Sequence, residues 1–514
     1  MKKLRNSSER KTHMNIQSEN YVANDDIMKE DFSLRVPPSA VTSDSVALVW
    51  GKTVGVYSVY MNGQLVEECS KTSCTVSGLK PDTEYAFFVS CRDRKTNEVK
   101  VRTRSKSKIM NILDFGAVSD GKTLSTAAIQ AAINACGEGE TVYVPQGNFV
   151  SGAVFLHGNM TFCVDGHLLG SDDDREYPVF KYRFEGREEP CYSSLINTAD
   201  GDMENITLCG SGVIDGNGKK LCPNELKGAK GSRGRTVCIR NTNGLYIKDI
   251  TIRNAPAWCT HIIYCENISV NNVKIYSKKD ESGVLYDLVN GDGLDPDSVK
   301  NMYIFDSLIE SEDDCIAIKS GRDTEGREIG IASENIYVMN CTFRCGFGVA
   351  MGSEASGGIK NVLVRDCVFE DTFSVGSVKS PRGRGGIIEN IRYSDCTHYY
   401  GNGEFTDCEW FRGAIYIDNF YSKITFDPSE KCPADEGTPK IRNIIFENIE
   451  LSTVGGNAIY LSGLPESPLE GIYLKNISAK GKFGLKAYNI RGLKTENVSV
   501  KSDGDADWQF TNIE

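Results

Sequence analysis

The chain of 514 residues lacks an excess of basic side chains, since 58 Lys and Arg stand against 70 Asp and Glu, giving a net charge of −12. Nucleic acids and anionic membrane surfaces are bound by basic faces, so this composition argues against both kinds of partner. An acidic chain that binds an anionic ligand must gather its positive charge locally. The composition leaves the oligomeric state open.

A long apolar run is missing behind the basic start of the sequence, MKKLRNSSERKTHMNIQSEN. We therefore expect neither a signal peptide nor a membrane span there, and residues 1–30 are predicted to form a flexible tail. Cysteine and histidine sets with zinc spacing are also missing, so no metal site is predicted. The 18 cysteines are scattered singly, a pattern typical of free thiols in a reducing compartment. These features together predict a cytoplasmic protein.

Residues 31–105 alternate apolar and polar positions in short runs such as VALVW, YSVYMNG and YAFFVSC. Such alternation predicts an antiparallel β-sandwich. The stretch LKPDTEY at 79–85, with Trp50 upstream, resembles part of a fibronectin type III domain. The resemblance implies a spacer or docking module without chemistry of its own.

Residues 110–514 form a second unit, in which a short amphipathic helix, TAAIQAAINAC, precedes a repeat. From Glu204 onward, Asn precedes alternating apolar positions that end in another Asn or Asp, as in ENITLCG, ENISVNN and ENIYVMN. The spacing of roughly 24 to 34 residues is that of a repeat architecture. Stacked in parallel, such short units bury a continuous interior, and Asn suits both left-handed turns and side-chain ladders.

The helix is expected to cap the open end of this stack of strands. A leucine-rich repeat would need a leucine-dense consensus and repeated helices, which the sequence lacks. We therefore predict an all-β chain, a right-handed parallel β-helix with a small N-terminal fibronectin type III-like β-sandwich.

Acidic residues are densest at 290–297, NGDGLDPD, and at 310–314, ESEDD. Asp292 and Asp313 are about one coil apart, so a parallel stack places them on neighbouring rungs of one face. Glycoside hydrolysis needs one carboxylic acid and one carboxylate, and crowded like charges keep one group protonated beside ionised neighbours. Carboxylates at this density are also typical of a calcium site or of a solvated acidic loop, and the spacing leaves both alternatives open.

The motifs Asn290-x-Asp292 and Asp313-Asp314, set in a β-helix, resemble those of the polygalacturonases of glycoside hydrolase family 28, inverting hydrolases of pectin. The similarity extends to IDGNG at 214–218, to NAPAW ending at Trp258 and to GSEASGG at 352–358. The upstream LLGSDDDREYPV and the fibronectin-like domain resemble the exo-acting bacterial members. The resemblance implies that Asp313 is the general acid, that Asp292 and Asp314 activate water, and that no cofactor is needed.

Two departures from the family concern substrate binding. The family's Gly-His-Gly appears as Gly346-Phe347-Gly348, without the histidine that tunes the acid, and its Arg-x-Lys appears as Ser377-Val378-Lys379. A serine cannot hold a carboxylate as a guanidinium does. Lys379 remains, and Arg382 and Arg384 on the next loop are predicted to supply a local basic cleft. A solvated turn is the alternative for that loop.

Phe347 is predicted to stack on the face of a sugar, which is compatible with rhamnose-containing pectin. The remaining predicted binding residues are Asn290, Glu354, Tyr416 and His261. A structural role is the more common one for a histidine in the position of His261.

The resemblance therefore implies an exo-acting galacturonidase that releases sugars from the non-reducing end of pectic oligosaccharides. A hydrolase of rhamnogalacturonan or another decorated pectin is the alternative within the class. A pectate lyase that uses calcium, or a carbohydrate-binding β-helix without catalysis, are alternatives from other classes.

Overall fold

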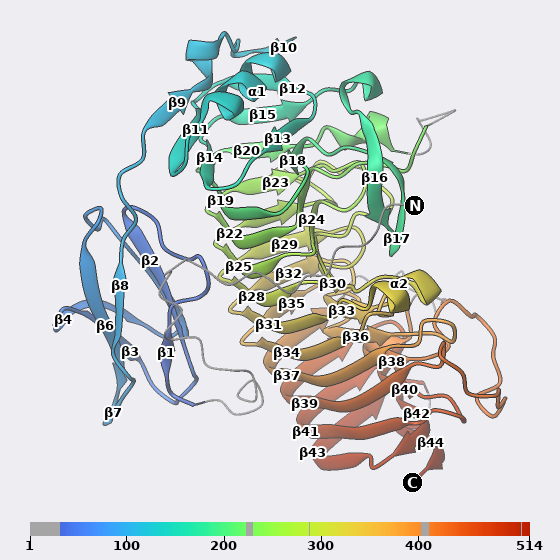
Figure 1. The fold of residues 1–514 in the computed structure, drawn as a ribbon. Helices are drawn as coiled ribbons and strands as arrows, with labels where there is room; N and C mark the ends of the chain where they lie inside the picture. Colours follow the sequence, from blue (N-terminus) through green and yellow to red (C-terminus); the bar gives the residue numbers. More distant parts are fainter. Residues whose placement is uncertain (1–30, 223–229, 287, 402–410, 505) are drawn as a thin grey trace, which may run out of the picture.

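The computed structural model describes residues 31–222, 230–286, 288–401, 411–504 and 506–514, and the tail predicted over residues 1–30 lies outside them. A small β-sandwich is followed by a long stack of parallel strands (Figure 1). The predicted all-β architecture, a right-handed parallel β-helix with a fibronectin type III-like sandwich, is confirmed.

The sandwich consists of two antiparallel sheets. Trp50, Tyr57 and Phe87 are buried between them. The hydroxyl of Tyr85 accepts a hydrogen bond from the Lys80 N–H at 2.9 Å, which pins this tyrosine at a corner of the sandwich. The strands are β1 (Leu34–Arg35), β2 (Ser45–Trp50) and β5 (Ser73–Ser77) in one sheet, and β3 (Tyr57–Met61), β4 (Gln64–Cys69), β6 (Glu84–Cys91), β7 (Arg94–Lys95) and β8 (Val99–Arg102) in the other.

The β-helix has three faces, because each coil contributes up to three strands that pair in parallel with the next coil. The face that contacts the sandwich carries β11 (Glu140–Val144), β14 (Met160–Val164), β19 (Met203–Cys209), β22 (Thr242–Lys248), β25 (Glu266–Asn271), β28 (Lys300–Phe305), β31 (Ser333–Met339), β34 (Ile359–Arg365), β37 (Ile387–Tyr400), β39 (Lys440–Thr453), β41 (Leu469–Gly481) and β43 (Lys494–Ser502). A second face carries β12 (Asn148–Ser151), β15 (His167–Gly170), β20 (Val213–Asp215), β23 (Thr251–Arg253), β26 (Lys274–Tyr276), β29 (Leu308–Ser311), β32 (Thr342–Cys345) and β35 (Val368–Glu370).

The third face carries the strands on which the functional site is built. They are β13 (Val154–Leu156), β18 (Ile196–Thr198), β21 (Val237–Arg240), β24 (Thr260–Ile263), β27 (Leu294–Asp297), β30 (Ile316–Ile318), β33 (Val349–Gly352), β36 (Gly376–Lys379), β38 (Gly413–Asp418), β40 (Asn457–Ser462), β42 (Phe483–Arg491) and β44 (Trp508–Ile513). Along each strand, alternate side chains point inward and outward.

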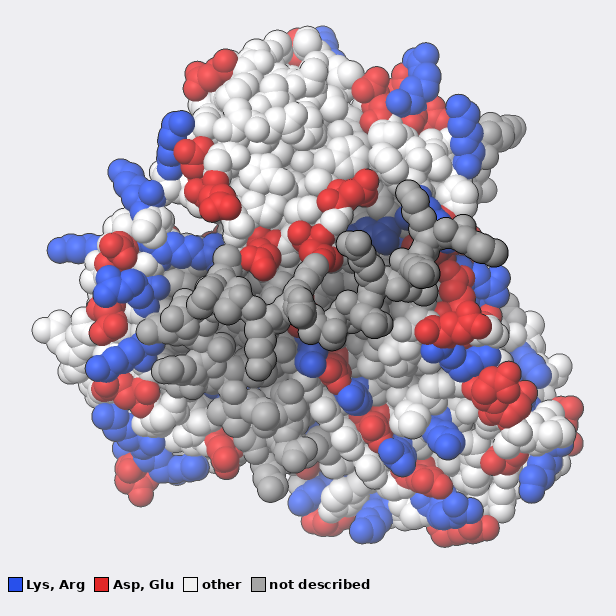
Figure 2. All heavy atoms as spheres, in the orientation of Figure 1, with Lys and Arg blue, Asp and Glu red and all other residues white. Residues whose placement is uncertain are grey.

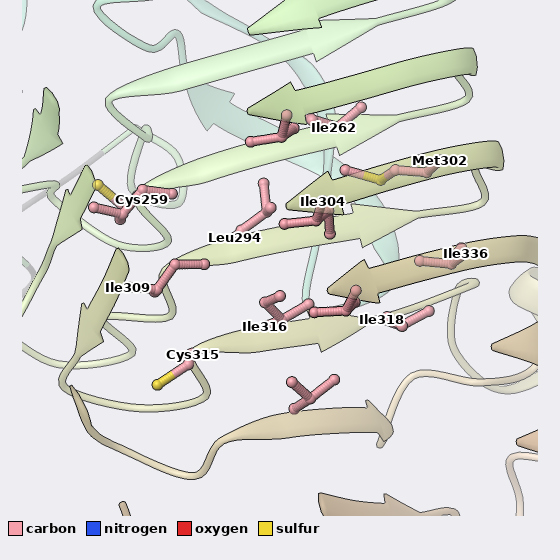
Figure 3. Packing of buried hydrophobic residues seen from close by; sticks show 14 of the residues in the cluster. Cys259, Ile262, Leu294, Met302, Ile304, Ile309, Cys315, Ile316, Ile318 and Ile336 are labelled. Atoms are coloured by element: carbon pink, nitrogen blue, oxygen red, sulfur yellow. The ribbon is translucent and has the colours of Figure 1, made fainter. Parts of the chain in front are cut away.

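Inward side chains stack on one another from coil to coil. Leu294 pairs with Ile316, which pairs with Val349, and all three are fully buried. Figure 3 shows Leu294 and Ile316 in this continuous aliphatic core. Burial of one apolar side chain of this kind contributes about 1.5–3 kcal/mol, and each coil depends on its neighbours for it.

Asparagines at the turns form the predicted ladder. Asn301 and Asn335 have left-handed backbones, with φ of 59° and 62°. The Asn335 side-chain amide donates to Asn301 Oδ1 at 3.0 Å, and the amide of Asn301 donates to Asn267 Oδ1 at 3.3 Å. The repeated Asn thus permits the turn and links each coil to the previous one.

A helix covers the N-terminal end of the stack, as predicted, and a second one was missed. Helix α1 (Thr126–Ala135) follows β9 (Ile109–Asn111), η1 (Ile112–Phe115) and β10 (Asp120–Leu124), and buries Ile129, Ala132 and Ile133. Helix α2 (Asp323–Ile329) was not predicted, because its seven residues are too short to show an apolar periodicity. Helices η2 (Asp174–Glu176) and η3 (Gly218–Leu221) are single turns.

The sandwich packs through an apolar cluster against the outer side of the β-helix face that begins with β11. Ala47 and Val49 of β2 lie among Tyr246, Tyr303 and Phe305 of the β-helix. Arg365 of β34 also donates to the Trp50 carbonyl oxygen at 2.8 Å. The sandwich therefore lies against a different face from the one that carries the site.

The cysteines in the described segments are free thiols, as predicted. Neither described helix has the length and apolar character needed to cross a membrane. Basic and acidic side chains are interspersed over the face seen in Figure 2.

Candidate active site

Three aspartates lie close together in the loops that precede two neighbouring strands of the third face. Asp292 lies in the loop before β27, and Asp313 and Asp314 lie in the loop before β30. β27 pairs in parallel with β30, and the Gly293 N–H donates to the Asp314 carbonyl oxygen at 2.9 Å. The structure thus places these carboxylates on adjacent rungs of one face, as their spacing predicted.

Glycine permits the close packing of backbone behind Asp313. Gly346 has φ of 52°, and a Cβ added to it would lie 1.9 Å from the Asp313 carbonyl oxygen. That same oxygen accepts a hydrogen bond from the Phe347 N–H at 3.1 Å. Since no larger residue fits at position 346, the Gly346-Phe347-Gly348 loop fixes the backbone of Asp313.

Two buried lysines contact the aspartates. Lys379, at the end of β36, places its Nζ 2.6 Å from Asp314 Oδ2. Lys319 follows β30 and places its Nζ 3.5 Å from Asp292 Oδ2. No more than 5% of either lysine is exposed. Each buried carboxylate therefore has an adjacent positive charge.

Burial and mutual repulsion raise the pKa values of all three carboxyl groups. Burial and the neighbouring charge of Asp292 raise the pKa of Asp313 to about 7. Burial raises the pKa of Asp292 to about 6 against the opposing effect of Lys319, and that of Asp314 to about 6 against the opposing effect of Lys379. Asp313 is partly exposed, whereas Asp292 and Asp314 are buried. Among these three aspartates, Asp313 thus has the highest pKa and is also the most exposed.

An aromatic cluster lies beside the acid. The Phe347 ring packs against Phe373 with ring centroids 4.8 Å apart, and Phe411 lies 6.4 Å from Phe347. Lys379 Nζ is 5.9 Å from the Phe347 centroid. Phe347 is half-buried, so part of its surface is available for contact with a ligand.

The predicted basic cleft on the loop after β36 does not offer free cations. Arg382 Nε lies 2.6 Å from Glu466 Oε1, and Arg384 Nη1 lies 2.5 Å from Asp323 Oδ1. Arg384 also lies 3.8 Å from Glu354 and is 8% exposed, so the alternative of a solvated turn does not describe it. These ion pairs leave the charges of Arg382 and Arg384 largely neutralised.

Glu354 lies at the centre of this network of charges. Its carboxylate contacts Lys319 Nζ at 3.3 Å and accepts a hydrogen bond from the Ser353 hydroxyl at 2.9 Å. Lys319 and Arg384 hold its pKa at about 2 in spite of its burial. Glu354 is therefore an ionised carboxylate engaged within the protein.

His261, Tyr416 and Asn290 are placed differently from one another. His261 is fully buried on β24, its Nε2 lies 3.4 Å from Asp297 Oδ2, and burial lowers its pKa to about 4. Tyr416 is fully buried on β38, in register with Ser377. Asn290 accepts a hydrogen bond from Arg233 Nη2 at 2.7 Å. The surroundings of His261 are those of a structural histidine.

Four residues of the site were missed in the sequence. Asp295 stands within the acidic stretch 290–297, and Lys319 follows five residues after Asp314. The outward positions of both on the third face follow from the strand alternation. Arg233 has no such signal. Trp258 closes the quoted NAPAW motif, and its ring lies 4.7 Å from Lys319 Nζ.

The geometry also bears on the calcium alternative. Among the described residues, no three His, Cys, Asp or Glu side chains are arranged to hold a metal ion. Lys319 and Lys379 contact the carboxylates that a hard cation would need. The arrangement therefore suits acid and base chemistry by the carboxyl groups themselves.

The fold and the site together define a parallel β-helix protein equipped for carboxyl acid–base catalysis. A family model described as glycosyl hydrolases family 28 matches residues 140–502, and one described as rhamnogalacturonase A/epimerase, pectate lyase-like matches residues 109–170. The chain belongs to glycosyl hydrolases family 28 and is thus a glycoside hydrolase.

Individual relatives agree with this assignment. A probable polygalacturonase of Vitis vinifera is 29% identical, with 82% of each chain covered. An exo-poly-alpha-D-galacturonosidase of Dickeya chrysanthemi is 29% identical over 88% of this chain and 92% of its own. The solved family 28 exopolygalacturonase of Yersinia enterocolitica, 22% identical, has the same fold with a TM-score of 0.68 over 94% of this chain and 98% of its own.

Proposed function

We propose that this chain is an inverting, exo-acting galacturonidase that releases galacturonate from the non-reducing end of pectic oligosaccharides. The observation that carries the proposal is the position of Asp313, a partly exposed carboxyl group with a pKa of about 7 beside two buried carboxylates with lower pKa values. The names of the relatives from Vitis vinifera and Dickeya chrysanthemi, a probable polygalacturonase and an exo-poly-alpha-D-galacturonosidase, support the choice of substrate.

In the proposed reaction, the protonated Asp313 donates its proton to the glycosidic oxygen as the bond to the anomeric carbon breaks. Asp292 and Asp314 accept a proton from a water molecule, whose oxygen attacks the anomeric carbon from the opposite side. One water molecule is consumed, and the released sugar has the inverted anomeric configuration. A return of the proton to Asp313 restores the starting state.

A hairpin favours action at a chain end. Strands β16 (Val179–Phe184) and β17 (Arg187–Tyr192) pair antiparallel and reach along the β-helix towards α2 (Figure 1). Arg183 Nη1 lies 2.7 Å from Asp297 Oδ1 on β27, and the Gly186 carbonyl accepts the Arg322 N–H at 3.0 Å. Because the hairpin contacts the outer side of β27 next to the aspartates, it would obstruct a long polymer along that strand face.

Arg233 is the proposed binding group for the uronate carboxylate. Its guanidinium donates to the Asn290 side chain at 2.7 Å, to the Pro256 carbonyl at 3.1 Å and to the Val289 carbonyl, and no described carboxylate lies within ion-pair distance of it. Only 7% of Arg233 is exposed. Within the described part of the chain, this guanidinium has no carboxylate partner, and it contacts Asn290, two residues before Asp292. It would supply the local positive charge that an acidic protein needs to bind an anionic sugar.

A second candidate is a hydrolase of rhamnogalacturonan, favoured by the side of the site away from Arg233. Phe347, Phe373 and Phe411 lie there, and Ser377 stands where a cation was expected. Such a surface suits an uncharged sugar, such as a deoxy sugar, next to the galacturonate.

The cytoplasmic location expected from the sequence also stays a prediction.

The test is product analysis on two sets of oligomers, one of galacturonate alone and one in which galacturonate alternates with rhamnose. Release of single galacturonates from homogalacturonate oligomers is expected. Faster cleavage of the alternating oligomers would favour the second candidate. Products with a double bond that absorbs in the ultraviolet would contradict both.

A further inference from the structure

Lys319 contacts three carboxyl groups that come from three different segments. Its Nζ lies 3.5 Å from Asp292 Oδ2, 3.5 Å from Asp295 Oδ1 and 3.3 Å from Glu354 Oε2. Asp292 lies in the loop before β27, Asp295 on β27 and Glu354 after β33. The Trp258 ring covers the ammonium at 4.7 Å. One buried cation thus links three coils around a predicted catalytic carboxylate.

The charges around Lys319 do not balance if all three carboxyl groups are ionised. Glu354 is ionised and also lies 3.8 Å from Arg384, so it shares two cations. Asp295 is fully buried, and neither of its oxygens accepts a hydrogen bond from the described part of the chain. Burial and the charge of Asp292 raise its pKa well above the ordinary range. Asp295 is therefore the poorer partner for Lys319, and the ammonium charge acts mainly on Asp292 and Glu354.

Other charged groups near Lys319 are already paired or more distant. The backbones of Asp297 and Lys319 form a parallel β-bridge, but the Asp297 carboxylate forms an ion pair with Arg183, whose Nη1 lies 2.7 Å from Oδ1. Asp314 faces Lys319 more weakly, since its partner is Lys379 at 2.6 Å. Asp292, in contrast, has Lys319 as its nearest described cation. Removal of Lys319 would leave Asp292 with only the weaker attraction of Lys379, which is paired with Asp314.

We propose that Lys319 is a positioning residue of the hydrolytic reaction, which holds a positive charge against Asp292 and fixes Asp292 relative to Glu354 and Asp295. Lys319 acts through Asp292 and does not touch the substrate. This inference rests on the proposed function, because it assigns Lys319 to the base side of that reaction.

The test compares Lys319→Met and Lys319→Arg with the wild type in kcat/KM as a function of pH, on one galacturonate oligomer. Without the ammonium, the pKa of Asp292 rises, so its ionised fraction falls at any given pH. The acid limb of the profile is expected to move up by about one pH unit or more in Lys319→Met, with KM little changed. Lys319→Arg keeps the charge and is expected to restore most of the acid limb.

Lys300→Met is the matched control, since Lys300 forms a partly exposed ion pair with Glu334 at 3.1 Å on another face. Its profile should equal that of the wild type. A folded Lys319→Met enzyme with the wild-type acid limb would overturn the inference. If Lys319→Met does not fold, Glu354→Gln takes its place, because it removes one of the carboxylates that Lys319 contacts and leaves more of the ammonium charge for Asp292. A wild-type acid limb in folded Glu354→Gln would overturn the inference equally.

A second readout needs no substrate. The carboxyl carbon of Asp292 is followed by NMR as pH is changed, with Asp292→Asn used to assign the signal. An upward shift of its midpoint in Lys319→Met is expected, and an unchanged midpoint would overturn the inference. If the wild type releases no sugar from any pectic oligomer, the proposed function fails, while the titration still decides the role of Lys319.

Discussion

Lys379 Nζ lies 2.6 Å from Asp314 Oδ2, and both side chains are buried. Removal of one partner of a buried ion pair leaves the other charge buried without compensation, which lowers the stability of the protein by about 3–5 kcal/mol. The pair also lowers the pKa of Asp314 against the effect of burial, so that it stays near 6. The same contact therefore stabilises the loop and keeps a carboxylate available as a base.

The dependence of activity on pH follows from the three pKa values. Asp292 and Asp314 must be ionised, so activity is lost as pH falls through about 6. Asp313 must be protonated, so activity is lost as pH rises through about 7. We expect a bell-shaped profile of kcat/KM with its maximum between these values, measured by initial rates in buffers of constant ionic strength. A flat profile from pH 5 to 9 would contradict the assignment.

Asp313→Asn removes the acid with little change in shape. We expect kcat to fall by about 10²–10⁴-fold, the usual contribution of general acid catalysis. Thermal unfolding should stay close to that of the wild type. Asp503→Asn, at an exposed position, is the matched control and should keep full activity. Unchanged sugar release by Asp313→Asn would support a protein that binds carbohydrate without catalysis.

Gly346→Ala tests the backbone support of Asp313. The added Cβ would lie 1.9 Å from the Asp313 carbonyl oxygen, and φ is 52°. Gly139→Ala is the matched control, because Gly139 has φ of 74° but no atom within 4 Å of the added Cβ. Urea unfolding is expected to show a loss of about 1 kcal/mol for Gly139→Ala and about 3 kcal/mol for Gly346→Ala. Equal losses would show that crowding at position 346 is unimportant.

Arg233→Lys tests the proposed binding of the uronate carboxylate. A lysine keeps the charge but loses the planar pair of donors, and charged hydrogen bonds contribute about 1.5–3 kcal/mol. We expect KM for a galacturonate oligomer to rise tenfold or more, with a smaller change in kcat. Lys230→Met, an exposed cation nearby in the sequence, should leave KM unchanged. Unaltered KM in Arg233→Lys would exclude this role for Arg233.

The repeat made the fold predictable, because the recurring Asn and the alternating apolar positions have one consistent packing. The spacing of Asp292 and Asp313 placed them on adjacent coils for the same reason. The partners of Lys319 and the environment of Arg233 could not be predicted, because they join loops far apart in the sequence. Arg382 was expected in a basic cleft, but Glu466, 84 residues away, neutralises it.

The anomeric configuration of the first product tests the central claim most directly. The reaction is followed by proton NMR from its first minutes, before the released sugar equilibrates between anomers. The account predicts release of single galacturonates whose anomeric configuration is inverted relative to the bond that is cleaved. Release with retained configuration, or of an unsaturated sugar, would contradict it.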